Sequence, residues 1–325
     1  MTGSASHRLN SRTMKAGNAL YEQINEKIIK LLQAQLNDFK QTWFNVKCEP
    51  FGYNPHSKHY YSALNNFLLQ ISLIFLRKGY YLNRWMTFLQ VQDIGAKVKK
   101  GSFADVIVFT SHIWLDQNGK NVTKQVEAMA TAGQQIPDGF NKIPFLKGYN
   151  VFNVADIEGL PPDWTTPKNV NVTAADRIKA VDEIISRTGA AIDETNTNAA
   201  YYSPTLDNIK IPKRWQFDTT EDFYKTLFHE LGHWTGHKDR LNREMSQAKK
   251  EYAFEELVAE LTAAYCCAKL GITTEVTNDA AYIRAWLKGL DNDMKFFTQA
   301  AAQAQKAADY ILEGNREEAE ERRAA

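Results

Sequence analysis

Residues 228–233 constrain this chain more than any other stretch, because they read Phe-His-Glu-Leu-Gly-His. Residues four positions apart lie on one face of a helix, so His229 and His233 can grip a single Zn²⁺. Glu230 directly follows the first histidine, and from there a carboxylate can act as a general base without being a ligand. The pattern predicts a helix that carries a zinc site and a catalytic glutamate.

The residues that flank the motif are typical of one amphipathic helix. Residues 218–221, Asp-Thr-Thr-Glu, can cap its N-terminus, and their acids suit the positive end of the helix dipole. Gly236 suits the end of the helix. Apolar side chains recur along the segment at Phe223, Leu227, Leu231 and Trp234.

A catalytic zinc site needs a third protein ligand, and residues 252–265 are the best source. Glu256 and Glu260 stand four apart on a stripe that is otherwise apolar, where an unpaired carboxylate is costly. We assign Glu256 as the ligand and Glu260 as the partner of a histidine's other ring nitrogen. Glu255, one position away, remains an alternative ligand. His237 is a rival, but its spacing differs from the metzincin pattern, which favours a loop or supporting role.

The length and composition limit the class of protein. A chain of 325 residues favours two domains. No apolar run reaches the roughly 18 residues of a membrane span, and the N-terminus lacks the apolar region of a secretory signal. The three cysteines, two of them adjacent, do not make a disulfide framework. We therefore expect a cytoplasmic protein with no membrane partner.

The net charge of +1 hides an asymmetry between the two halves. Residues 1–160 carry 18 Lys+Arg and 11 Asp+Glu, net +7, whereas residues 161–325 carry 21 and 27, net −6. In residues 39–92, basic side chains are interspersed among many aromatic ones, and Glu49 is the only acid. Aromatic rings can stack on unpaired bases while lysines and arginines follow the phosphates. We expect such contacts at Tyr60, Tyr61, Arg84 and Trp85, with Lys97, Lys99 and Lys100 on a basic segment nearby.

Local patterns divide the chain into segments. We expect a disordered tail at 1–16, a basic domain at 17–160, a proline-rich linker at 161–170, a domain with the histidine motif at 171–312 and a charged tail at 313–325. Helical spacing is found at 21–36, 174–188, 280–290 and 294–312. Strand patterns occupy 103–109, 149–154 and a pair within 199–211, and a polar loop covers 117–139. The mixture predicts an α+β protein.

Two sets of motifs occur in an order and spacing that point to a family. The first half holds Lys-His-Tyr-Tyr-Ser at 58–62 with Asn65, Trp-Met-Thr-Phe at 85–88 and Gly-Ala-Lys-Val-Lys-Lys-Gly at 95–101. The second half holds His-Glu-Leu-Gly-His-Trp-Thr-Gly-His at 229–237 and Tyr-Ala-Phe-Glu-Glu-Leu-Val-Ala-Glu-Leu at 252–261. In these stretches the chain resembles the ArdC-type antirestriction proteins of plasmids and other mobile elements.

The resemblance implies an N-terminal domain that binds single-stranded DNA and a C-terminal zincin-like metallopeptidase domain of the gluzincin type. It also implies that Lys58 and Asn65 belong to the nucleic-acid-binding set, and that the protein protects incoming DNA against host restriction. Three possibilities stay open. The zinc site can be an active peptidase, it can be purely structural, or the chain can be a peptidase that acts on a protein partner without DNA. We expect residues 1–160 to bind single-stranded DNA by themselves.

Overall fold

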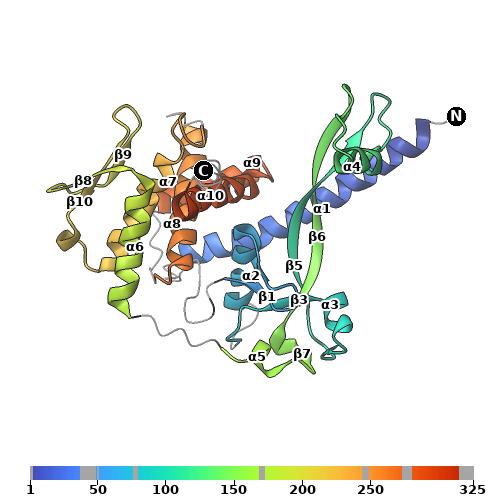
Figure 1. Ribbon diagram of the computed structural model, residues 1–325, viewed down its shortest axis with the longest axis horizontal. Helices are drawn as coiled ribbons and strands as arrows, with labels where there is room; N and C mark the ends of the chain where they lie inside the picture. The colour runs from blue at the N-terminus through green and yellow to red at the C-terminus, as the bar shows by residue number, and fades with distance from the viewer. Residues whose placement is uncertain are drawn as a thin grey trace.

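A computed structural model describes residues 3–36, 49, 51–75, 80–167, 173–243, 249–272 and 280–314 (Figure 1). The helices of the first half are α1 (Gly3–Leu36), α2 (Ala63–Phe75), α3 (Phe88–Asp93), α4 (Thr123–Thr131) and α5 (Pro162–Thr165). Its strands are β1 (Tyr53–Asn54), β2 (His59–Tyr60), β3 (Trp85–Thr87), β4 (Lys97–Val98), β5 (Asp105–Leu115), β6 (Asn141–Asn153) and β7 (Ile157–Glu158).

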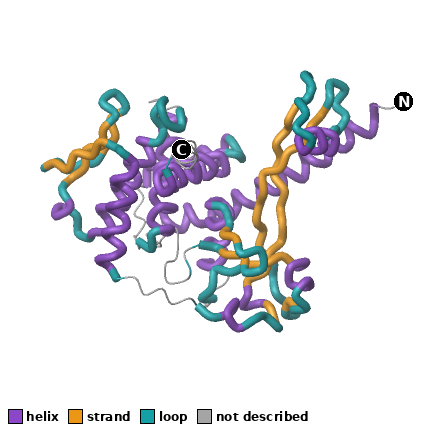
Figure 2. The backbone as a smooth tube through the Cα atoms, viewed as in Figure 1, coloured by secondary structure: helices purple, strands orange, loops and turns teal. Residues whose placement is uncertain are grey.

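The second half is mostly helical. Its helices are α6 (Ala174–Thr188), α7 (Thr220–Trp234), α8 (Lys249–Lys269), α9 (Ala280–Asn292) and α10 (Phe296–Glu313). Its strands are β8 (Ala191–Thr195), β9 (Tyr201–Ser203) and β10 (Asn208–Pro212). Figure 2 shows these helices gathered on one side of the molecule and the long strands of the first half on the other. The predicted α+β class is confirmed.

A long antiparallel hairpin forms the frame of the first half. Strands β5 and β6 pair along their length, and β3 pairs with the other edge of β6, giving the order β3-β6-β5. The strands expected at 103–109 and 149–154 lie at the base of this hairpin. The segment 117–139, expected to be a loop, connects the two strands but also forms helix α4. Val126 is the one buried residue of α4, so the segment lacks the repeating apolar pattern from which a helix is predicted.

Helix α1 runs from the second half out along the hairpin (Figure 1). The helix predicted at 21–36 is confirmed, and Ile24, Ile28, Leu31 and Leu32 are buried in it. The structure begins α1 at Gly3, within the segment expected to be a disordered tail. Helix α5 likewise begins inside the expected linker. Residues 168–170 of that linker and 315–325 of the charged tail lie outside the described residues.

The second half holds a three-stranded sheet of order β8-β10-β9, in which β10 is parallel to β8 and antiparallel to β9. The paired strands expected within 199–211 are therefore confirmed. The sequence did not predict β8, because Ala-Ile-Asp-Glu-Thr has little apolar character and most of it is exposed. Helix α6 has the predicted bounds, with Thr173 as its N-terminal cap and Gly189 ending it in the left-handed conformation at φ 70°.

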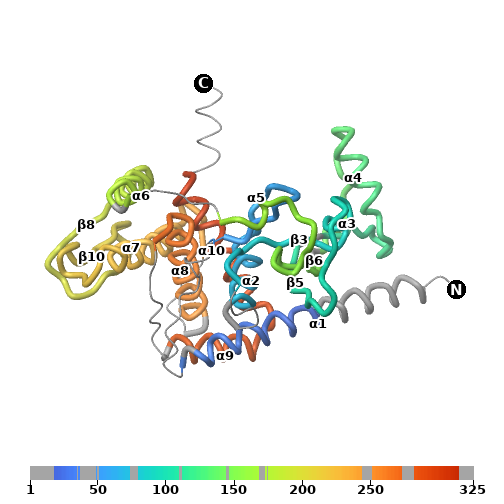
Figure 3. The backbone as a smooth tube through the Cα atoms, turned by 90° about the horizontal axis from the view of Figure 1, so that it is seen from below, coloured from blue at the N-terminus to red at the C-terminus, as the bar shows by residue number. Residues whose placement is uncertain are grey.

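The two halves share one hydrophobic core. Helices α1 and α2 contribute buried side chains to the same cluster as α7, α8, α9 and α10, and α1 runs beside α9 when the molecule is seen from below (Figure 3). The Nδ2 atom of Asn25 donates to the carbonyl oxygen of Met294 at 3.0 Å, and the backbone N–H of Ala63 donates to Gln305 Oε1 at 2.7 Å. Separation of the halves would expose this core, so binding of DNA by residues 1–160 alone stays a prediction that depends on the fragment folding.

Two further observations bear on the class of protein. Cys266 and Cys267 are buried in α8 as free thiols, as expected for small core residues. Within the described parts of the chain, every helix is too short or too polar to cross a membrane.

Candidate metal centre and nucleic-acid surface

Helix α7 presents the histidine motif and forms as its sequence predicts. Thr219 caps it by accepting a hydrogen bond from the backbone N–H of Asp222 at 3.1 Å, and Glu221 and Asp222 lie at its positive end. The helix ends at Trp234, two residues before Gly236. Its apolar stripe is buried, which fixes the helix against the core and sets the opposite side chains in place.

Gly232 lets α7 approach α8 closely. A methyl group at this position would lie 3.0 Å from the Cα atom of Ala259 on α8. That is tighter than ordinary van der Waals contact, so a larger residue would push the two helices apart. The glycine of the motif therefore sets the distance between the histidines of α7 and the glutamates of α8.

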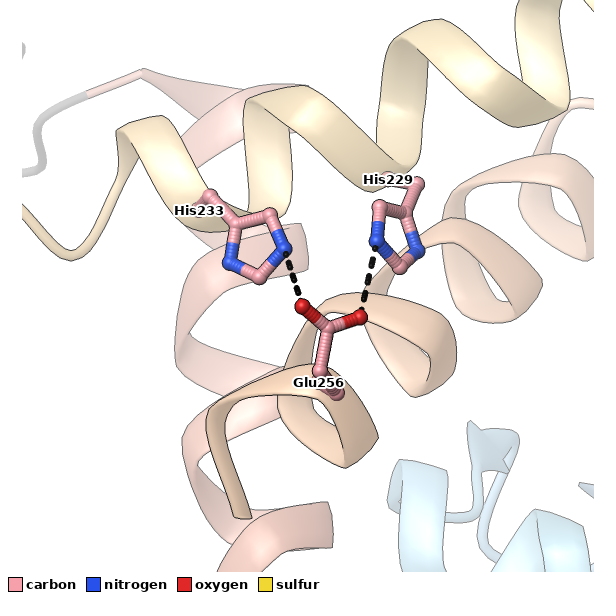
Figure 4. A group of neighbouring side chains, drawn as sticks. All are labelled: His229, His233 and Glu256. Atoms are coloured by element: carbon pink, nitrogen blue, oxygen red, sulfur yellow. Dashed lines mark ion pairs between the residues drawn. The ribbon is translucent and has the colours of Figure 1, made fainter. Parts of the chain in front are cut away.

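Three side chains come together between these helices. His229 and His233 project from α7, and Glu256 projects towards both from α8 (Figure 4). The Nε2 atom of His229 lies 3.5 Å from Glu256 Oε2, and that of His233 lies 3.6 Å from Glu256 Oε1. One ligand atom from each of the three residues lies within 4.8 Å of the other two. This donor set of two imidazoles and one carboxylate suits a divalent metal ion.

Each histidine has its own carboxylate on the other ring nitrogen. His229 Nδ1 lies 3.2 Å from Glu260 Oε2, and His233 Nδ1 lies 3.3 Å from Glu255 Oε1. Such contacts fix the tautomer, so that both Nε2 atoms are available on the side of Glu256. The expected placement of Glu260 is thus observed. Glu255, the alternative ligand, instead contacts the Nδ1 atom of His233, on the side of the ring away from Glu256.

Arg243 fixes Glu255 in turn. Its Nε donates to Glu255 Oε2 at 3.0 Å, and its other nitrogens donate to Thr235 Oγ1 at 2.8 Å and to the carbonyl oxygen of Gly232 at 2.6 Å. Both Arg243 and Glu255 are buried, with side chains 5% and 7% exposed. No role for this arginine was predicted from the sequence. The sequence feature that could have indicated it is the pair of arginines, Arg240 and Arg243, that closely follows the histidine motif.

The charges of the cluster support one another. Burial by itself would lower the pKa of His229, but the contacts with Glu256 and Glu260 outweigh it and raise that pKa to about 10. Burial would raise the pKa of Glu256, yet hydrogen bonding and charge from the two histidines lower it. The pKa of Glu260 is also lowered, by His229 and Lys225 against the effect of burial. The buried carboxylates and the imidazole of His229 therefore stabilise each other's charged forms.

Glu230 and Tyr252 complete the surroundings of the three side chains. Glu230 lies between the histidines in sequence and is only 7% exposed. Tyr252 lies one turn before Glu256 on α8, and its hydroxyl lies 3.2 Å from that of Tyr282. Hydrogen bonding to Tyr282, with burial and the charge of Glu256, raises the pKa of Tyr252. A buried acid and a neutral hydroxyl thus stand next to the candidate ligands.

The loop after α7 is held to the β9–β10 hairpin. Arg240 pairs with Asp207, which also accepts a hydrogen bond from the Tyr202 hydroxyl at 2.8 Å, and the guanidinium of Arg240 lies over the Trp234 ring at 4.0 Å. His237 belongs to this loop. This is one of the two roles expected for it; its Nδ1 lies 3.3 Å from Asp239 Oδ2, and it is not one of the three candidate ligands.

The structure corrects the expected nucleic-acid surface at three residues. Arg84 is 2% exposed and pairs with Glu49, and its Nη1 donates to the carbonyl oxygen of Asp163 at 2.8 Å. Trp85 is fully buried, so its ring has no face for a base. Asn65 is 1% exposed and exchanges two hydrogen bonds of 2.7 Å with the backbone of Val108, bracing β5. These residues support the fold.

The other expected contacts do lie on the surface. Tyr60 is 62% exposed, Tyr61 is half-buried and Lys58 is exposed in the turn before β2. Lys97, Lys99 and Lys100 are exposed on and after β4, and Lys99 Nζ donates to the carbonyl oxygen of Ala155 at 2.9 Å. The structure therefore keeps Tyr60, Tyr61 and the four lysines as candidates.

Comparisons with known proteins match both halves of the chain. Residues 18–152 match the N-terminal domain of anti-restriction factor ArdC, and residues 179–303 match the zincin-like metallopeptidase family. The zincin-like fold implies a divalent metal.

Curated relatives of similar identity differ greatly in length. Two Escherichia coli proteins named DNA primase TraC are each 31% identical, over 92% and 90% of this chain. The chain spans only 20% and 27% of their lengths. An uncharacterized protein of Sinorhizobium fredii, y4eC, is 30% identical over 92% of this chain and 94% of its own length.

Two solved structures match almost end to end. The metal-free crystal structure of the antirestriction protein ArdC from plasmid R388 has a TM-score of 0.72 and 32% identity, covering 91% of this chain and 97% of that one. Its Mn(II)-bound form has a TM-score of 0.69 and 31% identity with the same coverage. The chain therefore belongs to the ArdC family of antirestriction proteins.

Proposed function

We propose that this chain is an antirestriction protein that binds single-stranded DNA and carries a zinc-dependent peptidase site. The observation that carries the enzymatic part is the group of His229, His233 and Glu256, whose ligand atoms lie within 4.8 Å of one another beside the buried Glu230. Two imidazoles and one carboxylate form a three-ligand set typical of catalytic zinc. Sites made of nitrogen and oxygen ligands generally bind Zn²⁺ more tightly than Mn²⁺, the ion in the related crystal structure, which also favours zinc.

The residues of the chain divide the work of peptide hydrolysis. His229, His233 and Glu256 would hold the ion, which when bound supplies a Lewis acid that polarises a carbonyl group and lowers the pKa of water to about 7. Glu230 accepts the proton of the attacking water and delivers it to the leaving amine. Glu260 and Glu255 keep the imidazoles in the tautomer that leaves Nε2 free.

The DNA-binding part rests on the first half of the chain. Residues 18–152 match the N-terminal domain of ArdC, and residues 1–160 carry a net charge of +7. Exposed Tyr60 offers a ring face, and exposed Lys58 in the same turn, with Lys97, Lys99 and Lys100 on and after β4, offers cations, which suit unpaired bases and phosphates respectively. A chain bound along an incoming single strand would shield that DNA, which is how the proposed binding would protect it against restriction.

The test of the peptidase site compares the full chain with its Glu230→Gln variant. Both proteins are loaded with zinc, their metal content is measured by mass spectrometry and their cleavage of a mixed peptide library is followed. We expect about one zinc per chain in each. Loss of the general base should lower the cleavage rate on the order of 10²-fold or more. Asp193→Asn, an exposed acid on β8, is the matched control.

Other outcomes would revise the proposal. Stoichiometric zinc with no cleavage by the wild type would make the site structural. Equal cleavage by wild type and Glu230→Gln would remove Glu230 from the mechanism. Binding of a labelled single strand no tighter than a duplex at low salt would remove the DNA-binding part and leave a peptidase whose basic half meets another partner.

A further inference from the structure

An aromatic cavity opens between the β1–β2 turn and the β5–β6 hairpin. Its volume is about 590 Å³, within the range of sites that bind small molecules or parts of polymers. Its walls come from the turn, from β3 and α3, and from the hairpin. The lining residues that the argument uses are Asn54, Tyr60, Tyr61, Phe109, Lys147 and Tyr149.

The hairpin puts its aromatic and basic side chains on one face. Phe109 lies opposite Lys147 in the register of β5 and β6, and Ile107 lies opposite Tyr149. Residues opposite each other share a face, and so do residues two apart along a strand. The rings of Phe109 and Tyr149 meet edge to face with centroids 5.5 Å apart, and they remain 51% and 37% exposed. Large exposed rings held in fixed positions are ready to accept a flat ligand.

The floor of the cavity is built from hydrogen-bonded polar groups. Asn54 Nδ2 donates to the Tyr61 hydroxyl at 3.2 Å and to Gln90 Oε1 at 3.0 Å, and the Tyr61 hydroxyl donates to the carbonyl oxygen of Trp85 at 2.9 Å. The Oδ1 atom of Asn54 accepts from the backbone N–H groups of His56 and Ser57, each at 3.1 Å, which shapes the turn before Tyr60. The cavity is therefore preformed.

The charge at the cavity is positive. Lys147 Nζ lies 5.0 Å from the centre of the Tyr149 ring, and Lys269 Nζ, from α8 of the second half, lies 5.3 Å from that of Tyr60. Among the described residues that line the cavity, none is acidic. Exposed rings with lysines beside them and no carboxylate suit a base attached to phosphates and do not suit a cationic ligand.

We propose that this cavity takes an unpaired nucleobase of single-stranded DNA, with the neighbouring phosphates held by Lys147 and Lys269. The inference rests on the proposed DNA binding and adds to it the place and the residues. It also assigns a lysine of the zincin-like half to the nucleic-acid surface. Three of the side chains, Phe109, Lys147 and Tyr149, belong to segments that carried no such expectation from the sequence.

The test separates base contacts from phosphate contacts. Binding of the full chain is measured by fluorescence anisotropy to a labelled oligodeoxythymidylate of about 12 nucleotides and to an oligomer of equal length made of abasic residues. The proteins are the wild type, Tyr60→Ala, Tyr149→Ala and Tyr81→Ala. Tyr81 is the control, because it is 75% exposed but lies outside the cavity. Tyr60→Leu repeats the test with a better-packed side chain if the melting temperature of Tyr60→Ala falls.

We expect the wild type to prefer the normal strand. Tyr60→Ala and Tyr149→Ala should each weaken binding of that strand by about 5-fold to 150-fold, the worth of one stacked base, and should change binding of the abasic strand little. Lys269→Gln should weaken both strands and reduce the dependence of affinity on salt. Tyr81→Ala should bind both strands as the wild type does.

Two results would overturn the inference in different ways. If the wild type binds the normal strand but the cavity variants bind it as tightly as Tyr81→Ala does, DNA binding stands and the cavity is not its site. If the variants weaken binding of both strands equally, the rings take part in binding without contacting a base, and the assignment of a base to this cavity fails. If the wild type binds neither strand at low salt, the proposed DNA binding fails and the cavity assignment fails with it.

Discussion

The ring of Phe67 on α2 stacks on the ring of Phe297 on α10, with centroids 5.1 Å apart and planes 24° from parallel. The two residues are 230 positions apart in the chain, and both are fully buried. Their contact ties the half that matches the ArdC N-terminal domain to the half that matches the zincin-like family. The half proposed to bind DNA and the half with the candidate metal centre thus share one core.

Removing this contact should destabilise the whole chain. We expect Phe297→Ala to lower the free energy of unfolding by about 3–5 kcal/mol, because a large ring leaves a cavity in a packed core. Urea unfolding followed by circular dichroism and by tryptophan fluorescence measures the change. Both signals should give one coincident transition in wild type and variant. Two separate transitions, with only one shifted, would show that the halves unfold independently.

The carboxylates behind the histidines should tune metal affinity. We expect Glu260→Gln and Glu255→Gln each to weaken zinc binding by roughly 10-fold to 100-fold, because they orient the imidazoles and raise their basicity. Glu255→Gln should also lower the melting temperature, since Arg243 is left buried beside a neutral partner. Competition with a chromogenic chelator gives the affinities, with Asp193→Asn as control. Unchanged affinity in both variants would contradict the assignment.

The pairing of Arg240 with Asp207 should make stability depend on acid pH. Hydrogen bonding to Arg240 lowers the pKa of Asp207 below its ordinary value of 3.8, outweighing the effect of burial. A lowered pKa in the folded state contributes stability above the ordinary value, and that contribution is lost as the pH falls through the lowered value. Between pH 5 and pH 2, Asp207→Asn should therefore lose less stability than wild type. Parallel curves of melting temperature against pH would disprove the link.

The sequence was sufficient for the features that depend on local spacing. The cap at Thr219 and the helix around the histidines follow from helical periodicity, and the cost of a buried carboxylate pointed to Glu256 as a ligand while leaving Glu255 as an alternative. These constraints act within one helix or between two adjacent ones. Arg243 lay beyond them, because its partner Glu255 is found only when the loop after α7 folds back on α8.

The aromatic residues of the first half show where sequence reasoning reaches its limit. Trp85 and Tyr60 both lie in the same aromatic and basic stretch, yet one is fully buried and the other is 62% exposed. The difference arises because β3 pairs with β6, about 65 residues further along, and nothing local encodes that pairing. The shared core has the same cause, since composition divides the chain into two halves but cannot show that their helices pack together.

The most direct test of the metal centre is anomalous X-ray scattering at the zinc absorption edge from crystals of the full chain grown with zinc. We predict one strong peak, about 2.1 Å from the Nε2 atoms of His229 and His233 and from the Glu256 carboxylate. Glu255 and Glu260 should keep their contacts with the Nδ1 atoms. A peak coordinated by Glu255 or His237, or no peak between the two imidazoles, would contradict the account.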